Sequence, residues 1–325
     1  MQLDQIRQIA VIGLGRMGHG IAQSFAMAGF QVRGFDANSD QCKSAHHRIR
    51  RNLNEFVSND MLCSEDIEPI LGRLDVADTE AAAVADAQFV VEAIAEQRTA
   101  KQEFFARIEN AVADTTIIAS NSSTFTISES GANMRRPQRA VVTHWFNPPH
   151  IVPTVEVVPG PQTTDEIVET TVALHRKIGK LAVLIKREIP GFLVNRIQIA
   201  MIREVWDLYE RGVASREDID AAIRGSVGFR LAVCGPLATC DFGGVDIWST
   251  VYKGLAPDLR NDAVVPESIQ KLVDAGHCGT RTARGIHDYD PETIEEVTAQ
   301  RDEAMLKLAK LVNGQRSPDL TKPQT

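Results

Sequence analysis

The sequence contains no long apolar segment. No stretch approaches the roughly 18 consecutive apolar residues that a membrane-spanning helix requires. The first apolar strand begins at Ile9, and the eight residues before it are too few to hold a signal peptide. We therefore expect a cytoplasmic protein that makes no contact with a membrane.

Cysteine is scarce, and its positions argue against two kinds of site. The five cysteines are odd in number and scattered, with no Cys-x-x-Cys pair and no His–Cys spacing suited to a metal. We interpret them as reduced, packed thiols. We expect neither a disulfide framework nor a bound metal.

Positive charge is also in short supply. The chain has 35 Lys and Arg against 43 Asp and Glu, a net charge of -8. This argues against a nucleic-acid partner, because phosphate binding needs Lys and Arg clustered on one face. One basic cluster, formed by Arg48, Arg50 and Arg51, lies in a helical pattern. It is either a solvated helix face or a contact for a ligand phosphate.

Short apolar strands alternate with helical segments over more than half of the chain. This alternation predicts an α/β fold with a Rossmann-type, doubly wound, mostly parallel sheet covered on both faces. After Ile185, Pro190-Gly191 interrupts the pattern, and residues 192–211 then show apolar residues at helical spacing. We predict two domains, a Rossmann domain over 1–186 and an all-α domain over 187–325. The expected strands cover residues 9–12, 31–35, 88–93, 116–120, 139–143, 155–158 and 181–185.

A glycine-rich loop lies between the first strand and the first helix. It reads Gly13-Leu14-Gly15-Arg16-Met17-Gly18, and Asp36 follows 18 positions later at a strand end. The first glycine permits the tight turn, the second lets the backbone approach a pyrophosphate, and the third lets helix and strand pack closely. Asp36 would accept hydrogen bonds from the adenosine ribose and repel a 2′-phosphate, so the loop predicts NAD rather than NADP.

A second informative stretch runs from His144 to Glu156. His144 ends a strand, and three intervening prolines forbid a helix, so the chain must return through an extended loop. Such a return can bring Glu156 beside His144. An imidazole oriented by a carboxylate can take the proton of an alcohol as hydride leaves its carbon. The spacing alone is equally compatible with a structural histidine, and we interpret His150, inside the loop, as structural.

Four further motifs follow one another along the chain. They are Val91-Glu-Ala-Ile-Ala-Glu96, Ala119-Ser-Asn-Ser-Ser123, His144-Trp-Phe-Asn-Pro148 and Pro190-Gly-Phe-Leu-Val-Asn-Arg196. In this order they resemble motifs of the L-3-hydroxyacyl-CoA dehydrogenase family, and the resemblance covers nearly the whole chain. It implies an NAD-dependent dehydrogenase that acts on a small molecule, commonly as a homodimer through the helical domain.

The resemblance also implies roles for individual residues. His144 is the general base, Glu156 its partner, and Ser123 and Asn195 are polar groups near the reacting carbon. Arg281 stands where the family usually has a lysine that reaches toward the cofactor, and Arg differs from Lys in geometry. The other implied cofactor contacts, besides the loop Gly13 to Gly18 and Asp36, are Ala93, Glu96, Lys101, Asn121 and Asn147.

Two departures from the fatty-acid members concern the substrate. The helix after Asp36 lacks their lysine-rich stretch near the CoA nucleotide, although Arg48 to Arg51 could substitute for it. The segment Gly228-Phe-Arg-Leu-Ala-Val-Cys-Gly-Pro236 is longer than theirs and is similar to members that act on small hydroxy compounds, of the gulonate, carnitine and pyridine-carboxylate dehydrogenase types. We predict that Arg230 grips a substrate carboxylate through two parallel hydrogen bonds, with Trp145 as a second substrate contact.

Two alternatives remain open at this point. The 6-phosphogluconate and 3-hydroxyisobutyrate dehydrogenases also begin with Gly-Leu-Gly-x-Met-Gly, but they carry a catalytic lysine on a helix where this chain offers Asn195 and Arg196. A non-catalytic NAD-binding protein, of the lens crystallin type, is the other alternative. The substrate, CoA thioester or free hydroxy acid, is not fixed by these motifs.

Overall fold

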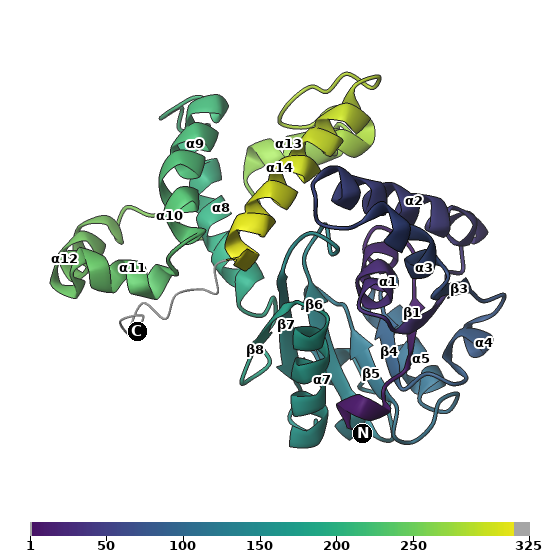
Figure 1. Ribbon diagram of the computed structural model, residues 1–325. Helices are drawn as coiled ribbons and strands as arrows, with labels where there is room; N and C mark the ends of the chain where they lie inside the picture. The colour runs from purple at the N-terminus through teal and green to yellow at the C-terminus, as the bar shows by residue number, and fades with distance from the viewer. Residues whose placement is uncertain (1, 315–325) are drawn as a thin grey trace, which may run out of the picture. The chain divides into compact units, whose positions relative to one another are not determined.

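The structure, a computed structural model, describes residues 2–314. The chain divides into two compact units, Met1–Asn195 and Arg196–Thr325. This division lies in the first turn of a long helix, just after the Pro190-Gly191 interruption on which the predicted boundary rests. Figure 1 shows the sheet of the first unit and the helices of the second.

The first unit is built on one eight-stranded sheet. Its strand order is β3-β2-β1-β4-β5-β6-β7-β8, and neighbouring strands are parallel except for the antiparallel pair β6 and β7. The chain order therefore reverses direction across the sheet between β1 and β4, which is the usual place for a nucleotide crevice. The strands are β1 Gln8–Ile12, β2 Gln31–Phe35, β3 Leu74–Val76, β4 Phe89–Glu92, β5 Ile117–Ser120, β6 Ala140–Trp145, β7 Thr154–Pro159 and β8 Leu181–Leu184.

Helices cover both faces of this sheet, as the alternation predicts (Figure 1). Alternate strand residues point to opposite faces, and each face has its own apolar core. One core joins the strands to α1 Gly18–Met27, α2 Ser39–Ser58, α3 Ile67–Leu71 and α7 Asp165–Lys177. The other joins them to α4 Glu80–Val84, α5 Arg98–Ile108 and α6 Ile127–Ser130.

The second unit consists of helices and loops over its described residues, and its only β-pairing there is the isolated bridges that join Arg284 to Gly279 and to Asp288. Ser215 caps its second helix, accepting a hydrogen bond from the Asp218 amide at 3.0 Å, as the capping pattern Ser-x-x-Asp indicates. No helix of the described chain is long and apolar enough to cross a membrane. The helices are α8 Val194–Glu210, which begins in the first unit, α9 Arg216–Ile223, α10 Phe229–Leu231, α11 Pro236–Gly243, α12 Val245–Leu255, α13 Glu267–Asp274 and α14 Ile294–Gly314.

The predicted fold class is confirmed, with one strand missed. Strand β3 has only three residues, and Asp75 interrupts its apolar pattern. It lies at the sheet edge and pairs with β2 alone. Its position depends on a neighbouring strand rather than on its own sequence, so the hydrophobic pattern does not reveal it.

Candidate active site

The glycine-rich loop follows β1 and enters α1, and its three glycines have different surroundings. Gly13 has φ +95°, and a Cβ there would lie 2.4 Å from the carbonyl oxygen of Ala93. A Cβ on Gly18 would lie 1.6 Å from the carbonyl oxygen of Gly13. A Cβ on Gly15 would meet nothing within 4 Å. Gly13 and Gly18 are thus required for packing, whereas Gly15 leaves open space beside the first turn of α1.

Asp36 lies at the end of β2, next to this loop. Its Oδ2 accepts the amide of Leu14 at 2.7 Å, and its Oδ1 accepts the amide of Asn38 at 2.8 Å. On α2, Arg48 donates to the carbonyl oxygens of Leu14 at 2.7 Å and Gly15 at 3.3 Å. The loop is therefore held from both sides. Amides at a helix N-terminus, with a carboxylate at the next strand end, fit a dinucleotide without a 2′-phosphate.

His144 and Glu156 form the buried centre of the site. They are direct partners in the antiparallel pair of β6 and β7. His144 Nδ1 lies 2.8 Å from Glu156 Oε2, and the two residues are 2% and 0% exposed. A carboxylate can only accept, so Nδ1 carries the proton and donates it to Glu156. The Nε2 atom is left with its lone pair, which is the form that can receive a proton.

The start of α8 holds Glu156 in place. The amides of Leu193 and Val194 donate to Glu156 Oε1 at 3.1 and 2.9 Å. Phe192, which precedes them, has φ +51° and is fully buried, with its ring centroid 5.5 Å from that of His144. Both carboxylate oxygens are thus satisfied, one by the imidazole and one by two helix amides. These hydrogen bonds fix the orientation of the carboxylate.

The loop after β5 brings Ser123 and Asn195 together. The side-chain amide of Asn195 donates to the main-chain oxygen of Ser123 at 3.0 Å. Glu96 fixes the same loop, because its Oε1 accepts the Ser122 hydroxyl at 2.6 Å and the amides of Ser123 and Thr124, both at 3.0 Å. The half-buried hydroxyl of Ser123 is left on a loop whose backbone is fixed.

Lys101 lies below this loop rather than on its surface. The residue is 1% exposed, and its Nζ is 2.7 Å from Glu92 Oε1 and 3.1 Å from Glu96 Oε2. Burial alone favours the neutral form of Glu96, but the Lys101 ammonium and the hydrogen bond from Ser122 together hold the pKa of Glu96 below its usual value. In this geometry the Lys101 ammonium is paired with Glu92 and Glu96.

The structure places the remaining predicted residues of the first unit in different surroundings. Ala93 follows β4 directly above Gly13, and Asn147 is exposed in the loop after β6. Asn121 is buried, and its Oδ1 accepts the amide of Trp145 at 3.0 Å. Trp145 is 1% exposed and belongs to the core on the sheet face opposite His144. Successive residues of β6 point to opposite faces, so the Trp145 ring and the His144 imidazole lie on different sides of the sheet. The substrate contact of Trp145 stays a prediction.

The two predicted arginines of the second unit are both exposed. Arg281 lies in the short helix Thr280–Thr282. Arg230 lines a cavity of about 470 Å³, and its one recorded hydrogen bond is to Ser226 Oγ at 3.4 Å. The cavity is rich in aromatic rings and contains no carboxylate; its other lining residues are Phe229, Val233, Cys234, Thr239, Phe242, Gly243 and Trp248.

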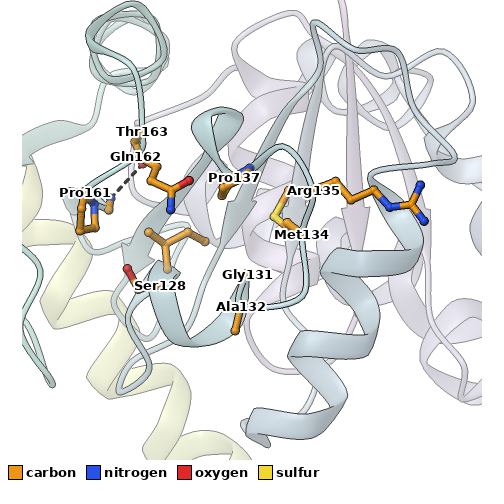
Figure 2. A pocket seen from close by; sticks show the side chains of 11 residues that line it. Ser128, Gly131, Ala132, Met134, Arg135, Pro137, Pro161, Gln162 and Thr163 are labelled. Atoms are coloured by element: carbon orange, nitrogen blue, oxygen red, sulfur yellow. Dashed lines mark hydrogen bonds between the residues drawn. The ribbon is translucent and has the colours of Figure 1, made fainter.

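Another hollow, of about 420 Å³, lies in the first unit between α6 and the turn after β7 (Figure 2). None of the predicted site residues lines it. Figure 2 shows the side chain of Arg135 extending away from the other lining residues. Residues 2–314 also contain no group of three or more His, Cys, Asp or Glu side chains that could hold a metal ion.

The sequence motifs did not single out three residues of this site. Glu92 accepts the Ser120 hydroxyl at 2.6 Å as well as Lys101, and it is a glutamate within an otherwise apolar strand. Such a buried charge is a signal in itself, since it requires a partner. Ser122 and Phe192 lie inside quoted motifs but have no property that marks them before the loops are placed.

Comparison with known proteins gives a consistent result for both units. The model of the 3-hydroxyacyl-CoA dehydrogenase NAD-binding domain matches residues 8–189, and that of the 3-hydroxyacyl-CoA dehydrogenase C-terminal domain matches residues 191–289.

Individual relatives cover nearly the full length. A 5-formyl-3-hydroxy-2-methylpyridine 4-carboxylate 5-dehydrogenase from Mesorhizobium japonicum is 35% identical over 95% of this chain and 99% of its own. A probable 3-hydroxybutyryl-CoA dehydrogenase from Bacillus subtilis is 36% identical over 89% of this chain and 99% of its own. A solved structure, described as a dehydrogenase of the same formylpyridine carboxylic acid and an NAD+ dependent dismutase, has a TM-score of 0.89 at 33% identity, covering 96% of this chain and all of the other.

Proposed function

This chain belongs to the 3-hydroxyacyl-CoA dehydrogenase family, and within it we propose that the protein oxidises a hydroxyl group beta to a carboxylate or thioester, with His144 and Glu156 as the base dyad. The enzyme is an NAD-dependent oxidoreductase. The observation that carries the proposal is the buried contact of 2.8 Å between the imidazole and the carboxylate.

The residues at the carboxyl ends of β1 and β2 fit NAD. The open space at Gly15 admits a pyrophosphate, and the first-turn amides of α1 supply its donors. Asp36 is placed to accept the ribose hydroxyls. Ala93, Glu96, Asn121 and Asn147 follow strands β4, β5 and β6, which are parallel to β1 and therefore end at the same edge of the sheet. NAD, when bound, accepts the hydride that leaves the substrate carbon.

His144 removes the hydroxyl proton in this proposal. Glu156 fixes the tautomer and stabilises the imidazolium that forms when Nε2 receives the proton. The amides of Leu193 and Val194 keep Glu156 from turning toward solvent. Ser123 donates a hydrogen bond to the substrate oxygen, and Asn195 keeps the backbone of Ser123 in register.

The substrate that we favour is a free carboxylate rather than a CoA thioester. The Arg48 guanidinium donates to main-chain carbonyls, and Arg50 pairs with Glu68. Two of the three arginines considered as CoA contacts therefore already have partners within the protein. Arg230 forms no ion pair with a carboxylate within residues 2–314, and it borders an aromatic cavity. These features suit a small acid of the kind named for the Mesorhizobium relative, whose formyl group, once hydrated, also presents a hydroxyl to a base.

We also propose that the enzyme is a cytoplasmic homodimer formed through its second unit. All five cysteines are free thiols, as expected in a reducing compartment. The second unit exposes large apolar side chains, and an exposed apolar face of this size indicates association. On α12 alone these are Val245, Ile247, Trp248, Val251, Tyr252 and Leu255. Sedimentation analysis yielding a monomer at micromolar concentration would contradict the dimer.

A substrate panel at fixed NAD tests the proposed activity. The panel sets acetoacetyl-CoA, with NADH, against free 3-hydroxy acids, carnitine, and hydroxymethyl- and formylpyridine carboxylates. We expect the highest kcat/KM with a free acid. Turnover of the CoA thioester alone would replace the free-acid proposal, and tight NADH binding without turnover of any compound would indicate a non-catalytic protein.

A further inference from the structure

A buried lysine lies on the opposite side of the sheet from the dyad. Lys180 precedes β8, is 9% exposed, and donates from Nζ to the carbonyl oxygens of Pro149 at 2.6 Å and Val152 at 2.8 Å. Its Nζ also stands 5.1 Å from the centroid of the Trp145 ring. Among the described residues it forms no ion pair with a carboxylate. An ammonium group is thus buried with two carbonyls and one aromatic face as its partners.

Burying this ammonium costs free energy, so we expect it to have a role in the fold or in the site. Removing an ammonium from water disfavours its charged form, and burial lowers the pKa of Lys180 to about 7. The nearby imidazole of His175 carries no negative charge that could pair with Lys180. Its Nδ1 donates to the Thr171 carbonyl at 2.7 Å. A methionine or leucine would fill the same space without this cost.

The two carbonyls belong to the loop that separates the dyad residues. This loop, residues 146–153, leaves β6 two residues after His144 and enters β7 two residues before Glu156. It also carries the exposed Asn147. The position of this loop relative to the sheet therefore determines where Asn147 lies, where β6 ends and where β7 begins.

The same loop packs against the cofactor helix on its other side. A Cβ on Gly20 of α1 would lie 2.8 Å from Pro149 Cγ and 2.8 Å from His150 Nδ1. No side chain fits between the helix and the loop at this point. The loop is thus enclosed between α1 and the Lys180 ammonium, so a shift at one side must be taken up at the other.

We propose that Lys180 is a positioning residue whose ammonium fixes the loop 146–153 between the dyad and the cofactor helix. Its effect on catalysis rests on the proposed function, whereas its effect on the loop does not. Lys180 touches neither substrate nor cofactor in this proposal. It acts through the carbonyls of Pro149 and Val152, and a misplaced loop lowers the rate because hydride transfer depends on geometry at the scale of about 1 Å.

Lys180→Met tests the proposal, with the exposed Lys177→Met as the matched control. Hydrogen exchange measured by mass spectrometry reads the loop directly, because the amides of Ile151 and Val152 both donate to the Pro148 carbonyl inside it. We expect faster exchange in the loop peptide of Lys180→Met, no change in peptides from β1 and β4, and a fall in kcat of about 10- to 100-fold with a smaller change in substrate KM. Unchanged exchange, or faster exchange with normal kcat, would overturn the proposal.

Chemical rescue separates the charge from the volume of the side chain. Lys180→Ala removes the equivalent of n-propylamine, so n-propylammonium should restore a part of kcat and slow the loop exchange again. The neutral n-propanol should do neither. Equal rescue by both compounds would assign Lys180 a packing role and refute the ammonium anchor. If the unmodified chain turns over no substrate, the proposed function fails. Hydrogen exchange in the loop still tests whether Lys180 fixes the loop, so the two failures are distinguishable.

Discussion

Val194, at the first position of α8, donates its amide to Glu156 at 2.9 Å, and the opposite oxygen of Glu156 receives the imidazole of His144 at 2.8 Å. A carboxylate near the middle of the chain is thus held by a helix start 38 residues later. The helix fixes the carboxylate, and the carboxylate fixes the tautomer of the imidazole.

This arrangement predicts different effects for the two dyad residues. His144→Gln should lower kcat by two or more orders of magnitude, the usual loss when a general base is removed, and leave the Kd for NADH within a few-fold. Glu156→Gln should lower kcat by about 10-fold or more, since its amide no longer fixes the tautomer. Steady-state kinetics and NADH fluorescence measure both, with the exposed His47→Gln as control. Near-normal turnover of His144→Gln would remove His144 from the mechanism.

Substitutions of Gly15 and Gly18 should affect NADH affinity and folding stability separately. Gly15→Ala adds a methyl group into open space, so we expect a melting temperature close to that of the parent and an NADH affinity lowered about 10-fold or more, because the methyl occupies the pyrophosphate approach. Gly18→Ala places a methyl 1.6 Å from the Gly13 oxygen and should lose about 3 kcal/mol or more of stability. Thermal melts and fluorescence titration decide. Normal NADH binding by Gly15→Ala would show that the pyrophosphate does not pass there.

Most of the fold could be predicted because its strands have a strong local signature. β1, β4, β5 and β6 each contain a run of three or more consecutive apolar residues, which is typical of strands buried on both faces. β3 could not be found this way, since its three residues gain their stability from pairing with β2.

The site could be predicted only where a side chain of catalytic type lies in a recognisable sequence pattern. The prolines between His144 and Glu156 forbid a helix, so an extended return can bring the two side chains together, and the structure has them in contact. The amides of Leu193 and Val194 could not be anticipated, because backbone groups have no sequence signature. The direction of the Trp145 side chain also depends on the strand rather than on the motif. Its neighbour His144 faces the site, and the two-residue period of a strand then turns Trp145 to the other core.

Asp36 should determine the choice between the two nicotinamide dinucleotides. Its carboxylate would repel a 2′-phosphate, and Asp36→Asn removes this charge while keeping an acceptor for the Leu14 amide. We expect the ratio of kcat/KM for NADP to that for NAD to rise about 10-fold or more, and further when Ala37→Arg supplies a cation. Ala37→Arg alone is the control for added charge. An unchanged ratio in Asp36→Asn would mean that another group excludes NADP.

Arg230 offers a test of the free-carboxylate proposal. Arg230→Ala should raise KM for the best free acid by about 10-fold, the equivalent of about 1.4 kcal/mol, because a guanidinium binds a carboxylate through two hydrogen bonds. KM for NAD should not change. Arg224→Ala, at an exposed arginine six residues before Arg230, is the matched control. If Arg230→Ala leaves KM for the acid unchanged, Arg230 is not the carboxylate contact.

The buried ring of His175 should account for part of the fall in the free energy of unfolding at acid pH. Its ring is fully buried against Phe25, Phe89 and Trp145. Burial lowers the pKa of His175 to about 4; the hydrogen bond to the Thr171 carbonyl opposes this shift, and the charge of Lys180 adds to it. Between pH 6.5 and 4 the unfolded chain therefore binds a proton at this residue that the folded chain does not. Stability must fall as the pH falls through this window, by about 2 to 3 kcal/mol at pH 4.5.

His175→Gln isolates this contribution, because glutamine does not titrate. The variant should be less stable than the parent at pH 7, since it loses ring contacts in the core. Its free energy of unfolding should nevertheless change less between pH 7 and pH 4.5, by about the 2 to 3 kcal/mol assigned to His175. Urea unfolding at several pH values gives both numbers, with His47→Gln as the control. A pH dependence in His175→Gln equal to that of the parent would show that His175 takes up its proton without unfolding, and that acid enters this core while the sheet is intact.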